Sequence, residues 1–304
     1  MNPALRLFFI VTACMLPVVG CNQPPQLQEP KYGTAPAQKQ ETVFSFAVHP
    51  LHNPQKLNQA YLPLIEHLNK QLKDARLELE ASRDYGNYEE KIRSKKPDFL
   101  LPNPWQTLEA MKAGYQVIAM AGDPQDFKGI FVVRRDSKIV KPVNLKGKAV
   151  SYPSPTALAA CIMPQNFLHG HGIDINKEIE NRYVGSQESS IMNVFLSQTA
   201  AGATWPPPWR AFQKEHPAEA AQLKVIWETP HLINNSVMVR NDLPPQIRDQ
   251  VRTALITLHE SPQGKEILAG METARFHPAT DADYEVVRRY VEQFEKTIRP
   301  VKQN

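Results

Sequence analysis

Short apolar segments alternate with longer amphipathic ones along most of the chain, and this alternation limits the folds that it can adopt. Residues 43–48 are rich in Val and Phe, as in a strand, and the segment that opens at Asn53-Pro54 keeps apolar residues at helical spacing as far as Leu72. Further strands are expected at 76–81, 99–101, 117–120, 129–134, 149–152, 181–184, 202–204, 223–227 and 236–239. Further helices are expected at 88–93, 105–113, 156–169, 188–197, 245–259, 261–269 and 281–296. This order predicts an α/β fold in which mainly parallel sheets are covered by helices.

The size and charge of the chain narrow the class of protein. A length of 304 residues suggests two lobes or one large domain. The chain has 35 basic and 31 acidic residues, a formal net charge of +4, which leaves no strong electrostatic case for binding nucleic acid. Its 27 prolines against 13 glycines indicate many rigid turns and argue against a helical bundle.

The first residues have the pattern of an export signal. Arg6 supplies a positive charge and residues 7–19 form an apolar stretch that ends at Gly20-Cys21. This ending resembles the lipobox of bacterial lipoproteins, which implies a signal peptide at 1–20, cleavage before Cys21 and acylation of its thiol. The alternative is an ordinary secretory signal with an incidental cysteine. The lipobox predicts a periplasmic protein anchored to a membrane through its lipid, because two or more acyl chains give stable attachment.

The cysteine count agrees with this prediction. Cys14 would leave with the signal peptide and Cys21 would be acylated, so only Cys161 remains and the mature chain has no intramolecular disulfide. Residues 21–41 are rich in Gln, Pro, Ala and Lys, and we expect them to form a flexible tether. The folded domain is expected to begin near Thr42.

Several local strings, taken in order, resemble one family. The chain is similar to the phosphate, phosphite and phosphonate-binding proteins of ABC importers, which have the type 2 periplasmic-binding-protein fold. The resemblance covers almost all of residues 42–298. The strings that carry it are Val48-His49-Pro50 with Tyr61-Leu62-Pro63-Leu64, Pro97-Asp98-Phe99-Leu100-Leu101-Pro102-Asn103-Pro104, Leu145-Lys146-Gly147-Lys148-Ala149-Val150, Val184-Gly185-Ser186, and Trp227-Glu228-Thr229-Pro230 with the following segment to Pro244.

The resemblance implies two α/β lobes, each a mainly parallel sheet flanked by helices, with a ligand cleft between them. Crossing segments are expected near 123–128 and 229–235. Lobe 1 would then contain residues 42–122 and 231–304, and lobe 2 residues 123–230. The resemblance also implies a monomer that binds a small molecule, docks on an ABC permease and uses no cofactor.

The chain departs from the family pattern on the ligand side. The family's Ser-Thr-Ser-Gly turn, whose hydroxyls and N–H groups bind an oxyanion, falls on Ala157-Leu158-Ala159-Ala160, unless Ser154 or Thr156 replaces a hydroxyl. The family's Asp-Ala-Gly-Ala becomes 200–203, Ala-Ala-Gly-Ala, and the lost carboxylate disfavours a ligand with an ammonium group. The Gly-Pro string with its tyrosine becomes Asn103-Pro104-Trp105, and a family histidine is replaced by Gln187.

The string Trp205-Pro206-Pro207-Pro208-Trp209 is the most unusual in the sequence. Three successive prolines predict an extended polyproline II path at the mouth of the cleft. The two indoles would then form an aromatic wall for a flat ligand, or Trp209 would dock a partner protein. The alternative is a rigid loop whose indoles pack on neighbouring helices.

Three histidines are candidates for the cleft. His49 and His52 follow the first strand, at the strand end where α/β sheets bind ligands, and His231 lies on the predicted return crossing. Neutral imidazoles would suit a metal and protonated ones an anion. The alternative is that these are surface or turn histidines.

Cys161 lies on the helix that begins the family's oxyanion pocket. A thiolate near that helix N-terminus would bind a soft ligand such as arsenite, whereas a buried thiol would be part of the core. No catalytic metal motif, nucleophile elbow or triad is evident, so we do not predict an enzyme, although a cleft histidine such as His49 would be the residue to test.

The sequence therefore predicts a lipid-anchored solute-binding protein of an ABC importer that holds a phosphonate-type oxyanion between two lobes. The alternative is a ligand-sensing periplasmic subunit of a membrane signalling protein, with arsenite or a flat aromatic compound as its ligand. No metal is expected in either case. The predicted ligand contacts are His49, His52, Asn103, Trp105, Ser154, Thr156, Gln187, Trp205 and His231.

Overall fold

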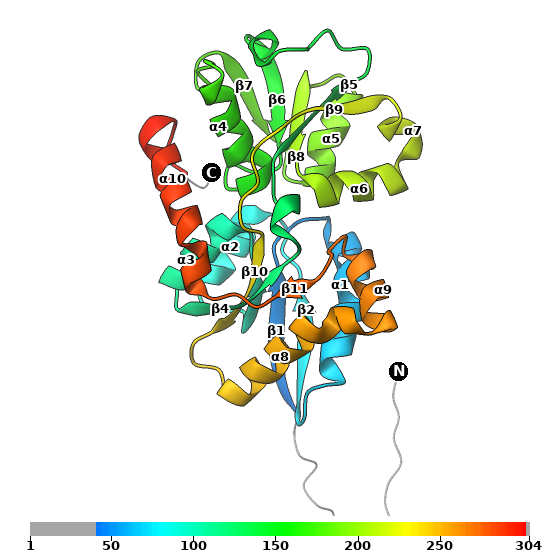
Figure 1. Ribbon diagram of the computed structural model, residues 1–304, viewed down its shortest axis with the longest axis vertical. Coiled ribbons are helices and arrows are strands. Elements are labelled where there is room, and N and C mark those ends of the chain that lie inside the picture. The colour runs from blue at the N-terminus through cyan, green and yellow to red at the C-terminus, as the bar shows by residue number, and fades with distance from the viewer. Residues whose placement is uncertain (1–40, 302–304) are drawn as a thin grey trace, which may run out of the picture. The chain divides into compact units, whose positions relative to one another are not determined.

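Two β-sheets, each flanked by helices, organise residues 41–301, the part of the chain that the computed structural model describes (Figure 1). The first sheet has the strand order β11-β4-β10-β3-β1-β2 and the second β7-β6-β8-β5-β9. We call each sheet with its helices a lobe. The predicted signal peptide, Cys21 and all but the last residue of the predicted tether lie outside the described residues.

Lobe 1 is built from two separate stretches of the chain. Its strands are β1 (Thr42–Val48), β2 (Ala75–Glu80), β3 (Phe99–Leu101), β4 (Tyr115–Ala121), β10 (Asn235–Arg240) and β11 (Phe276–His277). Its helices are α1 (Pro54–Asn69), α2 (Tyr85–Arg93), α3 (Pro104–Lys112), α8 (Pro245–Thr257), α9 (Pro262–Gly270) and α10 (Glu285–Thr297).

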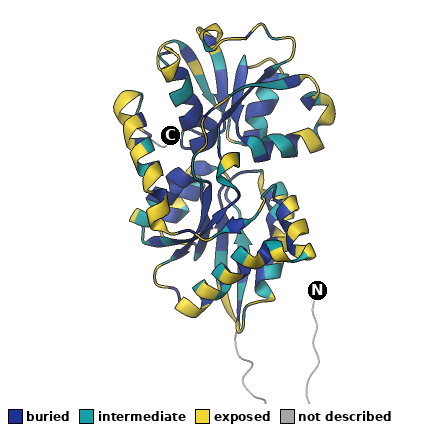
Figure 2. Ribbon diagram, in the orientation of Figure 1, coloured by how far each residue is buried: buried dark blue, intermediate teal, exposed yellow. Residues whose placement is uncertain are grey.

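Lobe 2 comes from the middle of the chain. Its strands are β5 (Ile130–Arg134), β6 (Lys148–Tyr152), β7 (Ile179–Tyr183), β8 (Ala201–Thr204) and β9 (Leu223–Glu228). Its helices are α4 (Met163–Gly170), α5 (Gln187–Phe195), α6 (Pro206–Glu215) and α7 (Pro217–Ala220). Buried residues run along both sheets, and exposed ones gather on the outer faces of the helices (Figure 2).

The strand pairing is more evenly mixed than the mainly parallel sheets that the sequence predicts. β1 is parallel to β2 and β3, and β6 is parallel to β7 and β8. β10 is antiparallel to β3 and β4, and β5 is antiparallel to β8 and β9. The reason lies in the crossings between the lobes: β4 and β9 each end where a crossing begins, and β10 and β5 each start where one ends. A strand that enters from the crossing therefore runs opposite to the strand that leaves toward it.

The two crossing segments, 122–129 and 229–234, are hydrogen-bonded to each other. The Thr229 amide donates to the Gly129 carbonyl at 2.9 Å, and the Gly129 amide donates to Thr229 Oγ1 at 2.9 Å. The Leu232 amide donates to the Phe127 carbonyl at 2.9 Å. The connection between the lobes is thus a paired segment rather than two independent linkers.

The predicted polyproline II path at Trp205–Trp209 is wrong, because the prolines begin a helix. Trp205 is the N-cap residue of α6, and Pro206, Pro207 and Pro208 occupy the first helical positions. The first N–H groups of a helix have no intrahelical acceptor, so prolines there lose no hydrogen bond, and their fixed φ suits the helix. The sequence prediction also missed α7 and β11.

The predicted helix at 156–169 is interrupted near its start. Residues 154–157 form a turn, Leu158–Ile162 form a single π-helical turn, and regular helix begins with α4. Cys161 and Ile162 both donate their amide N–H to the Ala157 carbonyl, at 2.8 and 3.2 Å. Such π turns inside helices frequently mark functional sites.

None of the helices in residues 41–301 is both long enough and apolar enough to cross a membrane.

Gly202 in β8 should not tolerate a side chain. A Cβ atom there would lie 2.5 Å from the Ser190 carbonyl oxygen and 2.7 Å from a methyl of Val194. We expect Gly202→Ala to lower the free energy of unfolding by about 1–3 kcal/mol, the usual cost of overpacking, measured by urea denaturation. The control Gly170→Ala, where no atom lies within 4 Å, should be neutral or slightly stabilising. Equal stability of the two variants would contradict the close packing of β8 on α5.

Candidate functional site

Polar side chains that follow strands of both sheets meet between the lobes. Asn103, just after β3, donates from Nδ2 to the carbonyl oxygen of Thr156, in the turn after β6, at 3.3 Å. Gln187, at the start of α5, donates from Nε2 to the hydroxyl oxygen of Tyr85 at 3.2 Å. The carboxyl ends of the strands in α/β sheets are the usual place for a ligand, and here both lobes contribute to that place.

A buried carboxyl group is the centre of the first contact. Glu89 of α2 is 2% exposed. Its Oε1 accepts from the Thr156 hydroxyl at 2.6 Å and from Gln106 Nε2 at 3.1 Å. The Ser154 and Thr156 hydroxyl oxygens are 3.0 Å apart. Burial raises the pKa of Glu89, and the hydrogen bonds from Thr156 and Gln106 oppose that rise in part.

The second carboxyl oxygen of Glu89 is unsatisfied. Among the described residues, Oε2 is buried and has no hydrogen-bond partner. An unpaired buried oxygen of this kind is costly. Oε1 of Glu89 therefore makes the link to lobe 2, whereas Oε2 can accept a hydrogen bond from a further donor or carry the proton of the neutral acid.

A capping box at the start of α3 orients the lobe 1 amides. Asn103 Oδ1 accepts from the amides of Trp105 and Gln106 at 3.0 and 3.1 Å, and Gln106 Oε1 accepts from the Asn103 amide at 3.1 Å. The two side-chain oxygens are thus used locally. Their NH2 groups remain to reach Thr156 and Glu89, so local helix capping presents two donors to the site.

The second contact surrounds Tyr85. Gln187 Oε1 accepts from the Thr204 hydroxyl at 2.8 Å, which fixes the amide that reaches Tyr85. The ring of His49 packs edge-on against Tyr85 with centroids 6.3 Å apart. Ser186 caps α5 by accepting the Ser189 amide at 3.1 Å. The N-terminus of α2 in lobe 1 and the N-terminus of α5 in lobe 2 therefore share one polar cluster.

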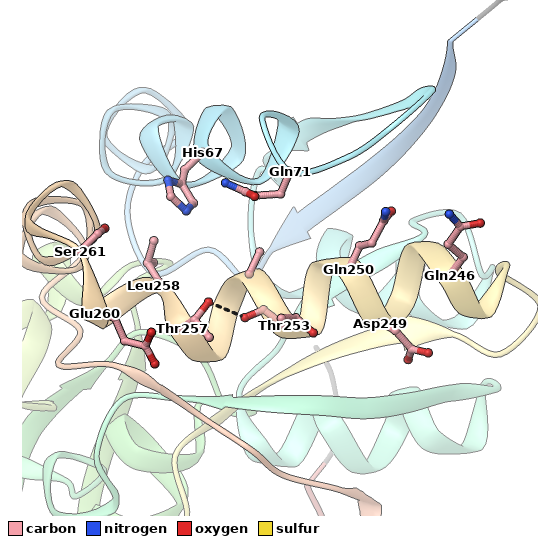
Figure 3. A pocket seen from close by; sticks show the side chains of 11 residues that line it. His67, Gln71, Gln246, Asp249, Gln250, Thr253, Thr257, Leu258, Glu260 and Ser261 are labelled. Atoms are coloured by element: carbon pink, nitrogen blue, oxygen red, sulfur yellow. Dashed lines mark hydrogen bonds between the residues drawn. The ribbon is translucent and has the colours of Figure 1, made fainter.

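A cavity of about 480 Å³ opens beside the first contact. It lies between α2 and the turn after β6. Its lining includes Tyr85, Glu89, Arg93, Ser154, Thr156 and Tyr183. A larger groove of about 790 Å³ runs between α1 and α8 of lobe 1 (Figure 3), and no predicted ligand residue lines it. We therefore take the smaller, interlobe cavity as the candidate site.

The structure contradicts the idea that cleft histidines bind an anion as cations. Burial lowers the pKa of His49 to about 4, opposed in part by the hydrogen bond between Nδ1 and the Leu101 carbonyl at 2.9 Å. Burial, together with the positive charge of Lys56, lowers the pKa of His52 to about 3. Both rings are neutral at physiological pH. His231 is exposed on the return crossing, so it does not share the buried setting of the other two.

The tryptophans act chiefly as packing residues. Trp105 and Trp205 are 6% and 5% exposed and belong to one apolar cluster. Trp205 packs edge-on against Phe127 of the first crossing segment, with centroids 5.5 Å apart. Trp209 is half-buried and stacks on Phe212 of its own helix at 6.0 Å. The indole of Trp209 is therefore partly covered by its own lobe.

Of the two alternatives for Cys161, the structure favours the buried core thiol over the thiolate. The side chain is fully buried, and burial raises the pKa of the thiol to about 12, although Arg299 lowers it in part. A neutral thiol is a poor ligand for arsenite, because the thiolate is the reactive form. Cys161 belongs to the apolar core.

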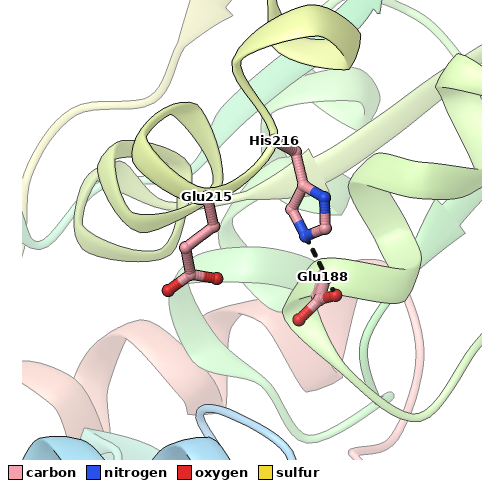
Figure 4. A group of neighbouring side chains, drawn as sticks. All are labelled: Glu188, Glu215 and His216. Atoms are coloured by element: carbon pink, nitrogen blue, oxygen red, sulfur yellow. Dashed lines mark ion pairs between the residues drawn. The ribbon is translucent and has the colours of Figure 1, made fainter.

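A group of charged side chains spans the lobes at the edge of the site. Glu188 of α5, Glu215 of α6 and His216 lie close enough to share a cation (Figure 4). Lys56 of α1 already pairs with Glu188 at 3.4 Å and also with Glu215. The carboxylates therefore bind an ammonium group of the other lobe, and the group is an interlobe ion pair.

The sequence prediction recovered part of the interlobe cluster. Asn103, Ser154 and Thr156 come together at Glu89, while Gln187 and His49 meet at Tyr85. The prediction missed Tyr85, Glu89, Gln106 and Thr204. One signal was available: Glu89 shares the apolar face of α2 with Tyr85, Tyr88 and Ile92, and an acid on a buried helix face needs a partner.

Two lobes with polar groups gathered between them, at the ends of their strands, define a solute-binding protein of the type 2 periplasmic-binding-protein fold. Residues 46–284 match the family model described as "ABC transporter, phosphonate, periplasmic substrate-binding protein". The chain belongs to this family. The predicted family and fold class are confirmed, and so is the prediction that the chain is a binding protein rather than an enzyme.

Two curated relatives are distant. A probable ABC transporter phosphite-binding protein of Prochlorococcus marinus is 24% identical over 181 residues, which cover 55% of this chain and 61% of the relative. The match thus spans about three fifths of that protein's length. The phosphonates-binding periplasmic protein of Escherichia coli is 20% identical over 264 residues, which cover 84% of this chain and 78% of the relative.

Two solved structures share the fold. A binding-protein component of an ABC phosphonate transporter from Pseudomonas aeruginosa has a TM-score of 0.76 at 19% identity, covering 84% of this chain and 87% of the other. The Prochlorococcus marinus protein in complex with methylphosphonate also has a TM-score of 0.76, at 21% identity, covering 84% and 99%.

The buried His49 should make the fold sensitive to acid. Because its folded-state pKa is about 4 and an unfolded histidine has a pKa near 6.5, the unfolded chain takes up the proton first as the pH falls. We expect this residue to remove about 2–3 kcal/mol of unfolding free energy between pH 7 and pH 4.5. Urea denaturation at both pH values should show a smaller loss in His49→Gln, whose amide can still donate to the Leu101 carbonyl. The exposed His231→Gln is the control and should lose as much as the wild type. An unchanged acid loss in His49→Gln would contradict a neutral, buried His49.

Proposed function

We propose that this chain is an extracytoplasmic solute-binding protein that captures a small phosphonate-type oxyanion between its lobes and delivers it to an ABC importer. The observation that carries the proposal is the interlobe contact among Asn103, Thr156 and Glu89. It lies between the lobes at the carboxyl ends of their strands, where α/β sheets usually bind ligands, and it uses residues of both lobes.

Neutral donors of both lobes gather at the proposed site, and Arg93 also lines the cavity beside them. Hydroxyl groups come from Ser154, Thr156 and Tyr85, and amide groups from Asn103 and Gln106. Preorganised, buried donors of this kind can hold an anion without a bound cation, since their dipoles replace its hydration shell. Ser154 and Thr156 thus take the place of the hydroxyl turn that the family pattern puts at 157–160.

Glu89 is compatible with an anion only in its neutral form. An ionised carboxylate beside a bound oxyanion would repel it. Burial already raises the pKa of Glu89, which favours the protonated acid. In that form the group can donate its proton, so the side chain that accepts from Thr156 can also contact a ligand oxygen through Oε2.

Lobe closure would couple binding to transport. A ligand that touches residues of both lobes favours the arrangement in which those residues are close, by its differential affinity for that state. The hydrogen-bonded crossing segments 122–129 and 229–234 provide the connection about which the lobes would move. The closed form would then be the one that the permease recognises.

A panel of small ligands tests the proposal. We expect phosphite or methylphosphonate to raise the melting temperature by several degrees, because ligand at 100 times its Kd stabilises by about 2.7 kcal/mol. Phosphate, sulfate, arsenite and benzoate complete the panel. A shift with arsenite or benzoate alone would support the sensing role instead, and no shift with any oxyanion would contradict the proposed ligand class.

The variant Thr156→Val tests whether the oxyanion binds at the interlobe site. Thr156→Val removes one hydroxyl at nearly constant volume, and we expect it to weaken binding of the responding oxyanion at least tenfold by calorimetry, since a lost hydrogen bond to a charged group costs about 1.5–3 kcal/mol. Thr253→Val, in the remote groove of lobe 1, is the matched control and should bind as the wild type does. Equal weakening in both variants would place the ligand elsewhere.

We also propose that Cys21 carries the lipid anchor and that the protein resides in the periplasm. The apolar stretch at 7–19 and the following Gly20-Cys21 support this. Cys21→Ser should move the protein from the membrane fraction to the soluble extract of an expressing bacterium, as seen by immunoblotting. Membrane attachment that survives this change would contradict lipidation.

A further inference from the structure

The C-terminal arm, residues 298–301, links the two lobes a third time. It follows α10, which packs beside α3 of lobe 1 and extends toward α4 of lobe 2 (Figure 1). The buried face of α10 is formed by Val287, Val291 and Phe294. The arm then passes to lobe 2, so the chain returns to lobe 2 after it has completed lobe 1.

Several contacts fasten α10 and the arm to lobe 2. Asn166 of α4 donates from Nδ2 to the Tyr290 hydroxyl oxygen at 3.0 Å, and Asn176 donates from Nδ2 to the Ile298 carbonyl at 2.9 Å. Val301 is 9% exposed and joins the central apolar cluster. Its amide donates back to Glu295 at 2.9 Å. The arm is therefore anchored along its length.

Arg299 makes the most specific contacts of the arm. Its Nη2 donates to the Pro155 carbonyl at 3.0 Å, and its Nε donates to Gln165 Oε1 at 2.8 Å. The guanidinium also lies 5.3 Å from the centroid of the Phe294 ring. No carboxylate of residues 41–301 forms an ion pair with it within 4.0 Å. Its remaining donors reach the Pro300 carbonyl of the arm at 3.0 Å and Cys161 Sγ at 3.5 Å, so all of these acceptors are neutral.

The Pro155 and Gln165 acceptors support the turn that carries the site. Pro155 lies between Ser154 and Thr156, the two hydroxyl residues beside Glu89. Gln165 is fully buried, and its amide also reaches Asn181 at 3.1 Å. Arg299 therefore links the backbone of the turn, at Pro155, to the buried side chain of Gln165 in lobe 2.

We propose that Arg299 is a positioning residue, and that the C-terminal arm holds the Ser154–Thr156 turn in the geometry in which Thr156 reaches Glu89. The planar guanidinium suits this task because it bonds two acceptors from fixed directions. The expected effect of an Arg299 substitution on ligand affinity rests on the proposed function. Its expected effect on the order of the turn does not, because that effect is measured in the protein without ligand.

Hydrogen exchange of the full-length protein tests the proposal. We expect Arg299→Ala to speed amide exchange at least tenfold in peptides that cover the amides of Ala157, Cys161 and Ile162, whereas peptides of β1 and β10 keep their protection. Arg288→Ala, on the preceding helix α10, is the control, because that arginine pairs with Glu285 at 3.1 Å. It should leave the turn unchanged. Wild-type protection of the turn in Arg299→Ala would overturn the proposal.

If Arg299→Ala loses amide-exchange protection throughout the protein, two milder variants test whether the arm orders the turn. Arg299→Lys keeps the charge but cannot bond both acceptors in the same way. Asn176→Ala releases the arm at Ile298 without touching Arg299. Each should speed exchange in the same peptides severalfold, and protection equal to the wild type in both would overturn the proposal.

Calorimetry with methylphosphonate separates this proposal from the proposed function. If the wild-type protein binds it, Arg299→Ala should weaken binding about tenfold, and unchanged affinity would overturn the positioning role in binding. If the wild type does not bind methylphosphonate or phosphite, the proposed ligand class fails. The exchange result then still decides whether the arm orders the turn.

Discussion

The hydrogen bond between the Thr156 hydroxyl and the Glu89 carboxyl joins the lobes at the centre of the candidate site. A carboxyl group that is 2% exposed has lost most of its hydration, so it must find donors or stay neutral. Among residues 41–301, Gln106 is the donor that lobe 1 supplies, and the second donor, Thr156, comes from lobe 2. The burial of one acidic side chain thus links the two lobes in the arrangement that the structure shows.

Different interactions hold the lobes on the two sides of that contact. On the side of α6, exposed or partly exposed charges pair across the lobes, as Lys56 does with Glu188 and Arg210 with Glu272. On the side of α10, the C-terminal arm uses apolar burial and hydrogen bonds to neutral groups. Exposed ion pairs contribute little to stability and weaken with salt, so the arm and the central contact define the interlobe geometry more strongly.

The periodicity of the sequence predicted the fold, but it could not predict which side chains of the two lobes hydrogen-bond to each other in the site. Alternating strand and helix patterns placed most elements within a few residues, since each buries one face. The prolines at 206–208 led to a wrong prediction because successive prolines suit both an extended path and the first turn of a helix. Their place directly after the N-cap residue Trp205 makes them the start of α6. Asn103, Thr156 and Gln187 were found through family strings. Glu89 was missed because its partners are distant in sequence, and the protonation of His49 depends on burial that the sequence does not state.

The neutral thiol of Cys161 has a consequence for the compartment in which this family works. Oxidation and disulfide exchange both proceed through the thiolate, and a fully buried thiol with a pKa of about 12 supplies almost none. Cys161 is the one cysteine of residues 41–301, and an unpaired thiol in an oxidising environment would otherwise be open to mixed disulfides. Cys161 lies within the π-helical turn and is buried in the apolar core, with Arg299 Nη2 3.5 Å from its sulfur, and this burial shields the thiol from such reactions.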